Sequence, residues 1–223
     1  MSTKEDYNNY AFVRGTIAEE FILSHELYEE RFYLTTISVL RNSGVSDDLL
    51  LMVPDCFIDP EKKYKGLTIS VVGQYRSHTI HVNKRRQIKL WIFAKKIKVG
   101  DQIDMIRENN QIYLRGYLKK PPTVRISASG WLVSDLVLEV PRSYGKSDSI
   151  PCVCWAIDAG SHSVGELCIV RGRIQSRKYQ KQLSDGEICI RTAYEVAVRS
   201  VEFEKYEHCL LDHVSAPQIG PPV

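Results

Sequence analysis

The chain has 223 residues, a hydrophobic fraction of 43% and a formal net charge of +3. This length allows one large or two ordinary domains, and the hydrophobic fraction is enough for packed cores. No apolar run reaches membrane-spanning length, and the polar residues 2–9 are unlike a secretory signal. We therefore expect a globular cytoplasmic protein that is not attached to a membrane. A net charge this small does not indicate which kind of partner the protein binds.

Cysteine and histidine spacing gives no sign of a metal or catalytic site. The six cysteines form no CxxC pair, so we expect small buried hydrophobes rather than zinc ligands or disulfides. The six histidines are scattered, and the sequence contains no nucleophile elbow, phosphate loop or metal-spaced carboxylate cluster. We therefore expect no enzymatic activity, no metal and no cofactor.

Ten short runs rich in valine, isoleucine, tyrosine and threonine show the pattern of strands. The first five are residues 10–20, 32–40, 49–53, 67–76 and 87–97. The other five are residues 112–118, 132–140, 150–157, 167–176 and 187–201. Four glycines stand inside or beside these runs, where they often mark bulges or sharp bends of a small barrel: Gly15, Gly73, Gly116 and Gly172.

The two sets of strands belong to an internal repeat. Residues 8–17 (NNYAFVRGTI) resemble residues 109–118 (NNQIYLRGYL) at an offset of 101, from Asn8 to Asn109. The same offset aligns residues 40–47 with 141–148, and residues 72–77 align with 171–176 at an offset of 99. Three separated matches at nearly one offset indicate a tandem duplication with a domain-sized period.

Five strands per unit with bend glycines favour a small closed barrel, and the five-stranded OB barrel is the economical choice. A sandwich would usually need more strands per unit. We predict an all-β protein of two tandem five-stranded OB-fold barrels. Unit one is expected at residues 8–100 and unit two at residues 109–205, joined by a short polar connection.

A hairpin in unit two, residues 167–198, carries the clearest functional signal. Ser184-Asp185-Gly186 separates its two arms, and Asp-Gly tolerates the left-handed backbone of tight hairpin turns. Cations and an aromatic on a projecting ribbon suit a polyanion with stackable bases, although charges that only blunt a sheet edge give the same pattern. The candidate contacts are Arg173, Arg177, Lys178, Tyr179 and Lys181.

Further candidates lie in turns and in unit one. A cationic turn of unit two contains Arg142, Tyr144 and Lys146. Trp131 follows a Ser-Gly turn, where it either stacks on bases or covers a core edge. In unit one the candidates are Tyr75, Arg76, Lys84, Arg85 and Arg86. The last three either neutralise phosphates or form a solvated turn.

Aromatic residues distinguish the two units. Unit one has Ser43 and Ile80 where unit two has Tyr144 and Tyr179. We therefore expect unit two to contribute more binding free energy. We also expect Trp155 in the core, while the sequence leaves the place of Trp91 open.

Unit two resembles the single-stranded DNA-binding proteins of bacteria and their relative, primosomal protein B. The resemblance covers roughly residues 111–203 and rests on residues 114–118, 122–125, 170–179 and 192–198, in order and at matching separations. Unit one matches more faintly, through residues 13–15 and the strand around Gly73. The resemblance implies single-stranded DNA binding in replication, recombination or repair, with Tyr144 and Tyr179 as stacking aromatics. Since the family commonly assembles four barrels, it also implies a homodimer, with the edge at residues 109–118 as a contact.

The sequence departs from this family at two places. Residues 158–165 are too short for the helix that the family carries between its third and fourth strands. Residues 217–223 (PQIGPPV) lack the acidic tail ending in phenylalanine, so recruitment of partners by such a tail is not expected.

Two alternatives stay open from the sequence. RNA fits the same contacts, because stacking and phosphate contacts do not report the 2′-hydroxyl. In the other alternative, the chain is an OB-fold adaptor or primosome-type scaffold in a replication or conjugation complex, acting mainly through protein contacts.

Overall fold

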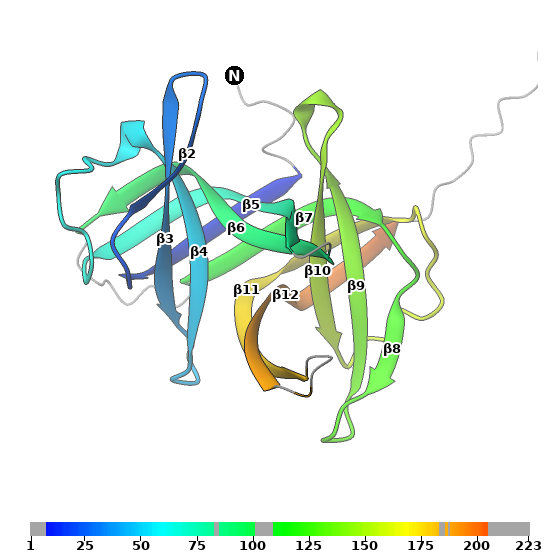
Figure 1. Ribbon diagram of the computed structural model, residues 1–223. Helices are drawn as coiled ribbons and strands as arrows, with labels where there is room; N and C mark the ends of the chain where they lie inside the picture. Colours follow the sequence, from blue (N-terminus) through cyan, green and yellow to red (C-terminus); the bar gives the residue numbers. More distant parts are fainter. Residues whose placement is uncertain (1–7, 83–84, 101–108, 183–185, 187, 205–223) are drawn as a thin grey trace, which may run out of the picture.

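The computed structural model describes residues 8–82, 85–100, 109–182, 186 and 188–204, and at residues 80–82, 85–87, 144 and 181 it describes the backbone alone. Unit one contains β1 (Asn9–Ile17), β2 (Ile22–Leu27), β3 (Glu30–Leu40), β4 (Ser46–Pro54), β5 (Thr68–Val82) and β6 (Arg85–Val99). Unit two contains β7 (Asn110–Leu118), β8 (Thr123–Ile126), β9 (Leu132–Pro141), β10 (Ser147–Trp155), β11 (Leu167–Gln182) and β12 (Ile188–Glu204). Two 3₁₀ turns, η2 (Asp55–Phe57) and η3 (Ser143–Gly145), complete the described elements (Figure 1).

Each unit closes into a barrel through the same ring of strand pairs. In unit one, β3 pairs with β4, β4 with β6 in parallel, β6 with β5, β5 with β1, and β1 again with β3. Unit two repeats this ring with β9, β10, β12, β11 and β7. A five-stranded closed barrel with these connections is the OB fold, which confirms the predicted fold class.

Each unit also has a sixth strand that the sequence pattern did not predict. β2 and β8 lie at the two ends of the sheet order, and among the described residues each pairs with one neighbour only, β3 and β9 respectively. All of their residues are exposed, so they lack the alternation of buried and exposed positions that reveals a strand in a sequence. The hairpin arms β5 and β11 are also longer than predicted, because they extend beyond the barrel wall, where pairing needs no core.

The four repeat glycines lie where the barrels close. A Cβ atom on Gly73 would lie 2.2 Å from the carbonyl oxygen of Phe93, and one on Gly172 would lie 2.2 Å from that of Ala197. Both glycines stand at shifts in strand register. Gly15 faces the carbonyl of Ser38 in the same way, at 2.4 Å. The backbones approach so closely that only glycine fits, which is the physical reason why glycine recurs at these positions of the repeat.

The two barrels share one sheet through β1 and β7, which pair in antiparallel register from Asn9 opposite Leu114 to Val13 opposite Asn110. The predicted dimer contact at this edge is therefore wrong, since β1 of the same chain already occupies the edge of β7. A single cluster of buried apolar side chains runs through both units, so the barrels share their core.

The repeated asparagines continue the strand ladders across the bulges. Asn110 donates from Nδ2 to the carbonyl of Ile174 (2.7 Å) and accepts from its backbone N–H (2.9 Å). Asn9 makes the same pair of bonds to Tyr75, each at 2.8 Å. Both asparagines are buried, so each side chain satisfies two backbone groups that water cannot reach.

Replacing Asn110 with alanine is expected to lower the free energy of unfolding by about 2 kcal/mol, because it leaves the amide and carbonyl of Ile174 unpaired in the interior. Urea unfolding followed by circular dichroism measures the change. Asn42→Ala, in an exposed loop, is the matched control and should differ from wild type by less than about 0.5 kcal/mol. Equal stabilities of the two variants would contradict this role of Asn110.

Three of the described cysteines are buried, as predicted: Cys152, Cys154 and Cys168. Burial raises the pKa of Cys154 and of Cys168 to about 12, so both thiols stay protonated near neutral pH. Cys56 is exposed and Cys189 is half-buried, which departs from the expectation. In the described part of the chain, no helix has the length and apolarity of a membrane span.

Candidate nucleic-acid interface

A groove of about 720 Å³ opens on unit one and includes residues of unit two. Its walls come from the β2–β3 hairpin, from β4, β5 and β6, and from η3 with its flanks. In Figure 1 the β2–β3 hairpin and the β9–β10 turn project on the same side of the molecule. We call this the unit-one groove; it is lined by His25, Tyr28, Met52, Arg76, Ser77, His78, Trp91, Phe93, Lys95, Arg142, Ser143 and Lys146.

Five ring-bearing side chains line this groove. Trp91 lies 5.7 Å from His78, measured between ring centroids. Arg76 and Lys95 lie over the ring of Phe93, at 5.7 Å and 5.8 Å from its centroid. Tyr28, at the tip of the β2–β3 hairpin, is 93% exposed. Such rings offer the flat apolar faces on which nucleobases stack.

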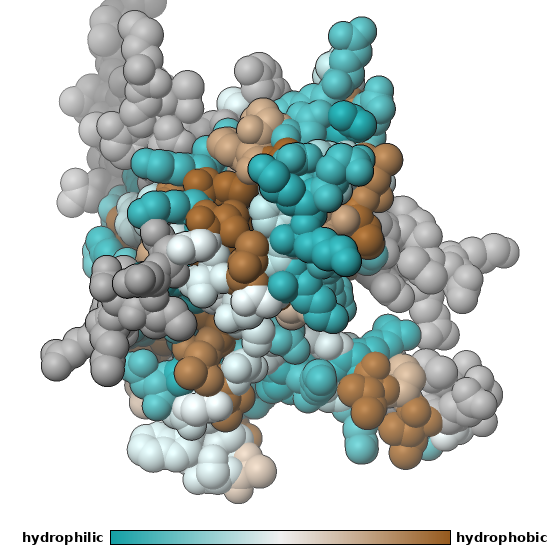
Figure 2. Space-filling view, turned by 90° about the vertical axis from the view of Figure 1, so that its left-hand side faces the viewer, coloured by the Kyte–Doolittle hydropathy of each residue, from teal (hydrophilic) through white to brown (hydrophobic). Residues whose placement is uncertain are grey.

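The charge of the groove favours an anion. Its lining contains Arg76, Lys95 and Lys146, together with Arg142, whose charge Asp148 neutralises, and none of the described residues that line it is acidic. Cations beside rings match the alternation of phosphates and bases along a single strand. Figure 2 shows unit one's side of the molecule, where apolar patches lie between hydrophilic side chains rather than merging into one apolar face.

A second groove of about 580 Å³ lies on unit two, and we call it the unit-two groove; it is lined by Lys120, Arg125, Asp135, Leu136, Val137, Pro151, Cys152, Val153, Trp155, Arg177 and Glu195. Two of its cations are paired within the chain. Arg125 lies 2.7 Å from Asp135, and Arg177 lies 3.6 Å from Glu195. The hydrogen bond to Asp135 raises the pKa of Arg125. The prediction that Trp155 lies in the core is wrong, since this last residue of β10 is 48% exposed.

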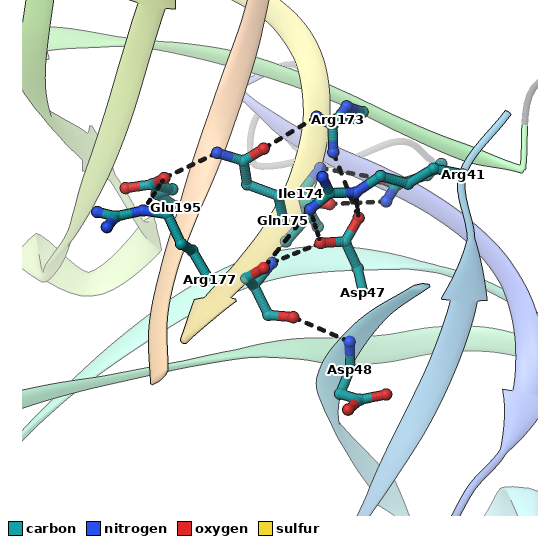
Figure 3. Close-up of polar contacts among 10 residues, drawn as sticks. Arg41, Asp47, Asp48, Arg173, Ile174, Gln175, Arg177 and Glu195 are labelled. Carbon is teal, nitrogen blue, oxygen red and sulfur yellow. Dashed lines mark hydrogen bonds and ion pairs between the residues drawn. The ribbon is translucent and has the colours of Figure 1, made fainter. Parts of the chain in front are cut away.

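Beside the grooves, two ionic clamps hold the units together. In the first, Asp47 of β4 is fully buried and accepts the backbone N–H of Ser176 on β11, at 2.8 Å (Figure 3). Arg41 binds both carboxylate oxygens of Asp47, and this hydrogen bonding raises the pKa of Arg41. The hydroxyl of Ser176 accepts the N–H of Asp48 at 2.9 Å. Arg173 adds a 3.3 Å ion pair to Asp47.

The second clamp repeats the first with the units exchanged. Asp148 of β10, 1% exposed, binds Arg142 through both oxygens and accepts the backbone N–H of Ser77 on β5. Arg142 donates to the carbonyl of Ser77 at 2.9 Å, and the hydroxyl of Ser77 accepts the N–H of Ser149 at 2.8 Å. The two clamps together form a seam between the units, in which a buried carboxylate of each unit binds one strand of the other.

These contacts change the interpretation of three predicted site residues. Tyr75 is 1% exposed, and burial raises the pKa of its hydroxyl well above the usual range. The prediction that Tyr75 contacts nucleic acid is therefore wrong, because β5 turns this side chain into the core. Arg142 and Arg173 were predicted as ligand contacts, but both guanidinium groups bind carboxylates of the seam. Desolvation by burial lowers the pKa of Arg173.

Other predicted residues lie on exposed surface. On the β11–β12 hairpin, Tyr179 is 36% exposed and faces Arg191 across the ladder. Arg177 shares its face of β11, whereas Lys178 is exposed on the opposite face. Trp131, in the β8–β9 turn, is 60% exposed.

The remaining predicted residues fall partly outside the described structure. Lys84 lies outside the described residues altogether. For Arg85, Arg86, Tyr144 and Lys181 the structure describes the backbone alone, so their predicted contacts stay predictions.

Sequence reasoning missed the row of side chains on β6. Trp91, Phe93 and Lys95 alternate with the buried Leu90 and Ile92, so all three point out of the barrel on one face. The period-two spacing of two aromatics and a lysine was visible in the sequence. Only the barrel shows that this face lines a groove. Unit one therefore has aromatic side chains in its own groove, so the aromatic residues alone do not favour unit two as the stronger binder.

The two closed rings and the basic, aromatic groove define a tandem OB-fold protein with an open ligand surface. No family model matches the sequence. Single-stranded DNA-binding protein 2 of Listeria innocua is 34% identical over 104 residues, which cover 42% of this chain and 63% of that protein. Single-stranded DNA-binding protein B of Bacillus subtilis is 32% identical over 83 residues, 33% of this chain and 74% of that protein. The chain belongs to the single-stranded DNA-binding protein family, which confirms the resemblance seen in unit two. It spans less than two thirds of the length of the Listeria relative.

Solved structures show that the likeness extends over both units. The wild-type single-stranded DNA-binding protein of Thermus aquaticus superimposes with a TM-score of 0.67 at 16% identity, covering 96% of this chain and 95% of that one. A deletion mutant of the same protein gives a TM-score of 0.65 at 17% identity, covering 88% and 94%. At this identity the comparison establishes the shared fold.

Proposed function

We propose that this protein is a non-enzymatic cytoplasmic protein that binds single-stranded DNA in replication, recombination or repair. The observation that carries the proposal is the unit-one groove, where rings and cations line one surface without acidic side chains among the described residues. The names of the curated relatives support the same ligand.

Binding in this groove combines two interactions that need no base sequence. Phosphates are held by Arg76, Lys95 and Lys146, which replace condensed counterions. Bases stack on Trp91 and Phe93, because every base has a π-face. The arrangement requires unpaired, splayed bases, so it favours a single strand over a duplex.

A fluorescence titration with oligo-dT tests the proposal. Stacking on Trp91 should quench tryptophan emission to a saturable endpoint, and a duplex of equal length should bind more weakly. Oligo-rU as a second ligand compares RNA with DNA. Absence of saturable binding to either oligonucleotide at low salt would overturn the proposal.

Removing two groove cations is expected to weaken the salt dependence of binding. For the double variant Lys95→Gln, Lys146→Gln, the slope of log K against log salt should fall by about 0.7 for each phosphate that the protein no longer neutralises. Tyr179→Ala is the contrasting variant. It should cost about 1 kcal/mol in affinity while leaving the slope nearly unchanged, because stacking releases few counterions. Affinities measured at several salt concentrations decide both, and an unchanged slope in the double variant would contradict phosphate binding by these lysines.

We propose further that the chain forms a homodimer and so assembles four OB folds. In the described strand pairings, β2 and β8 each keep one edge available for this contact, whereas β7 is paired within the chain. Sedimentation at micromolar concentration should give twice the mass of the chain. A monomer with and without oligo-dT would contradict the proposal.

An adaptor role is the second candidate, and one observation favours it. Every residue of β2 is exposed, including Ile22, Leu23 and Leu27, at 63%, 58% and 52%. Apolar side chains on an unpaired edge strand are typical of sites where another chain adds a strand. Failure of oligo-dT to bind would leave this candidate as the better one.

A further inference from the structure

The two ionic clamps lie at the bases of the two hairpins. Ser77 stands between Arg76 and His78, which both line the unit-one groove, but the carboxylate that holds its backbone belongs to Asp148 of unit two. In the described strand pairings, residues 74–82 of β5 pair only with β6. Outside this strand pair, the base of the β5–β6 arm is held by the bonds from Asn9 to Tyr75 and, two residues further along β5, by the clamp at Ser77.

The equivalent arrangement holds for the other hairpin. Ser176 precedes Arg177, which lines the unit-two groove, and its backbone is held by Asp47 of unit one. In the described pairings, residues 173–182 of β11 pair only with β12. At the base of each hairpin, a backbone N–H thus donates to a buried carboxylate of the other unit.

We propose that Asp148 and Asp47 are positioning residues for nucleic-acid binding that act across the seam. Asp148 of unit two orients the unit-one groove, and Asp47 of unit one orients the unit-two groove. The carboxylates are buried and lie outside the lining of both grooves, so they act through Ser77 and Ser176 rather than through the ligand. The inference rests on the proposed function.

The test uses one tryptophan for each groove. In a Trp91-only background, Trp131 and Trp155 are replaced by phenylalanine, and in a Trp155-only background Trp91 and Trp131 are replaced. Each background is titrated with oligo-dT, alone and with Asp148→Asn or Asp47→Asn. Asparagine keeps the size of the side chain and one acceptor for the serine amide, but it loses the charge that holds the arginine.

A crossed pattern is expected. Asp148→Asn should weaken the binding that Trp91 reports by about tenfold, which corresponds to the loss of one stacked base. The same variant should weaken the binding that Trp155 reports by less than about twofold. Asp47→Asn should do the reverse. A general loss of stability would weaken the binding reported by both tryptophans equally. Equal weakening in both backgrounds therefore overturns the inference, and so does the absence of any weakening.

Two further controls keep the test decisive. Ser77→Ala removes only the hydroxyl contact to Ser149, so it should show the Asp148→Asn pattern with a smaller loss, even where Asp148→Asn does not fold. If this variant leaves the Trp91 signal unchanged, the inference fails. Failure of both parent backgrounds to bind oligo-dT would instead overturn the proposed function, and this inference with it.

Discussion

Replacing Gly73 with alanine is expected to lower the free energy of unfolding by about 3 kcal/mol, at the upper end of the usual cost of overpacking. The added Cβ would meet the carbonyl oxygen of Phe93 at 2.2 Å. This neighbour is backbone, so it cannot move aside by changing a rotamer. Relief requires the bulge between Val72 and Gly73 to open, and the closure of the unit-one barrel depends on that bulge.

The measurement is chemical unfolding of Gly73→Ala beside Gly160→Ala. A Cβ on Gly160 would meet the side-chain atoms Asp158 Oδ1 and Val124 Cγ2, at 3.1 and 3.2 Å, which can shift. The control should therefore lose less than about 1 kcal/mol. Similar losses in the two variants would show that the close approach at the bulge is not what requires glycine.

Replacing Trp91 with leucine is expected to weaken oligo-dT binding by about 2 kcal/mol, or roughly thirtyfold. Leucine keeps an apolar side chain on β6 but offers no flat face to a base. Trp91 also packs against His78, 5.7 Å away, so a small loss of stability accompanies the change. Intrinsic fluorescence loses one reporter in this variant, so fluorescence anisotropy of a labelled oligonucleotide is the suitable measurement.

Tyr10→Leu is the matched control for this variant. Tyr10 is 41% exposed on β1 and lies opposite Tyr113 in the β1–β7 strand pair, outside the lining of both grooves. It should bind oligo-dT like wild type. If Tyr10→Leu loses as much affinity as Trp91→Leu, the loss does not come from stacking in the unit-one groove.

The success of sequence reasoning here depended on local signals. The runs around the ten predicted strands alternate because each strand buries one face, and Gly73 and Gly172 repeat because each barrel closes at the same bulge. The strands β2 and β8 were missed because they bury neither face. Arg142 was a reasonable candidate ligand contact from its turn, since a sequence does not show that Asp148 neutralises it.

By itself, the sequence determined the duplication, the all-β class, the OB barrels and the family resemblance. All of these follow from residue spacing within a strand or between repeats. The tertiary structure alone decided that Tyr75 is core, that Trp155 is exposed and that Trp91 lines a groove, because these depend on which face of a strand another element covers. It also decided the seam, where Asp47 and Asp148 meet serines more than 70 residues away. In the sequence, Asp47 and Asp148 and the arginines that they bind look like ordinary turn residues. Burial between two barrels leaves no pattern in the neighbouring sequence that would reveal it.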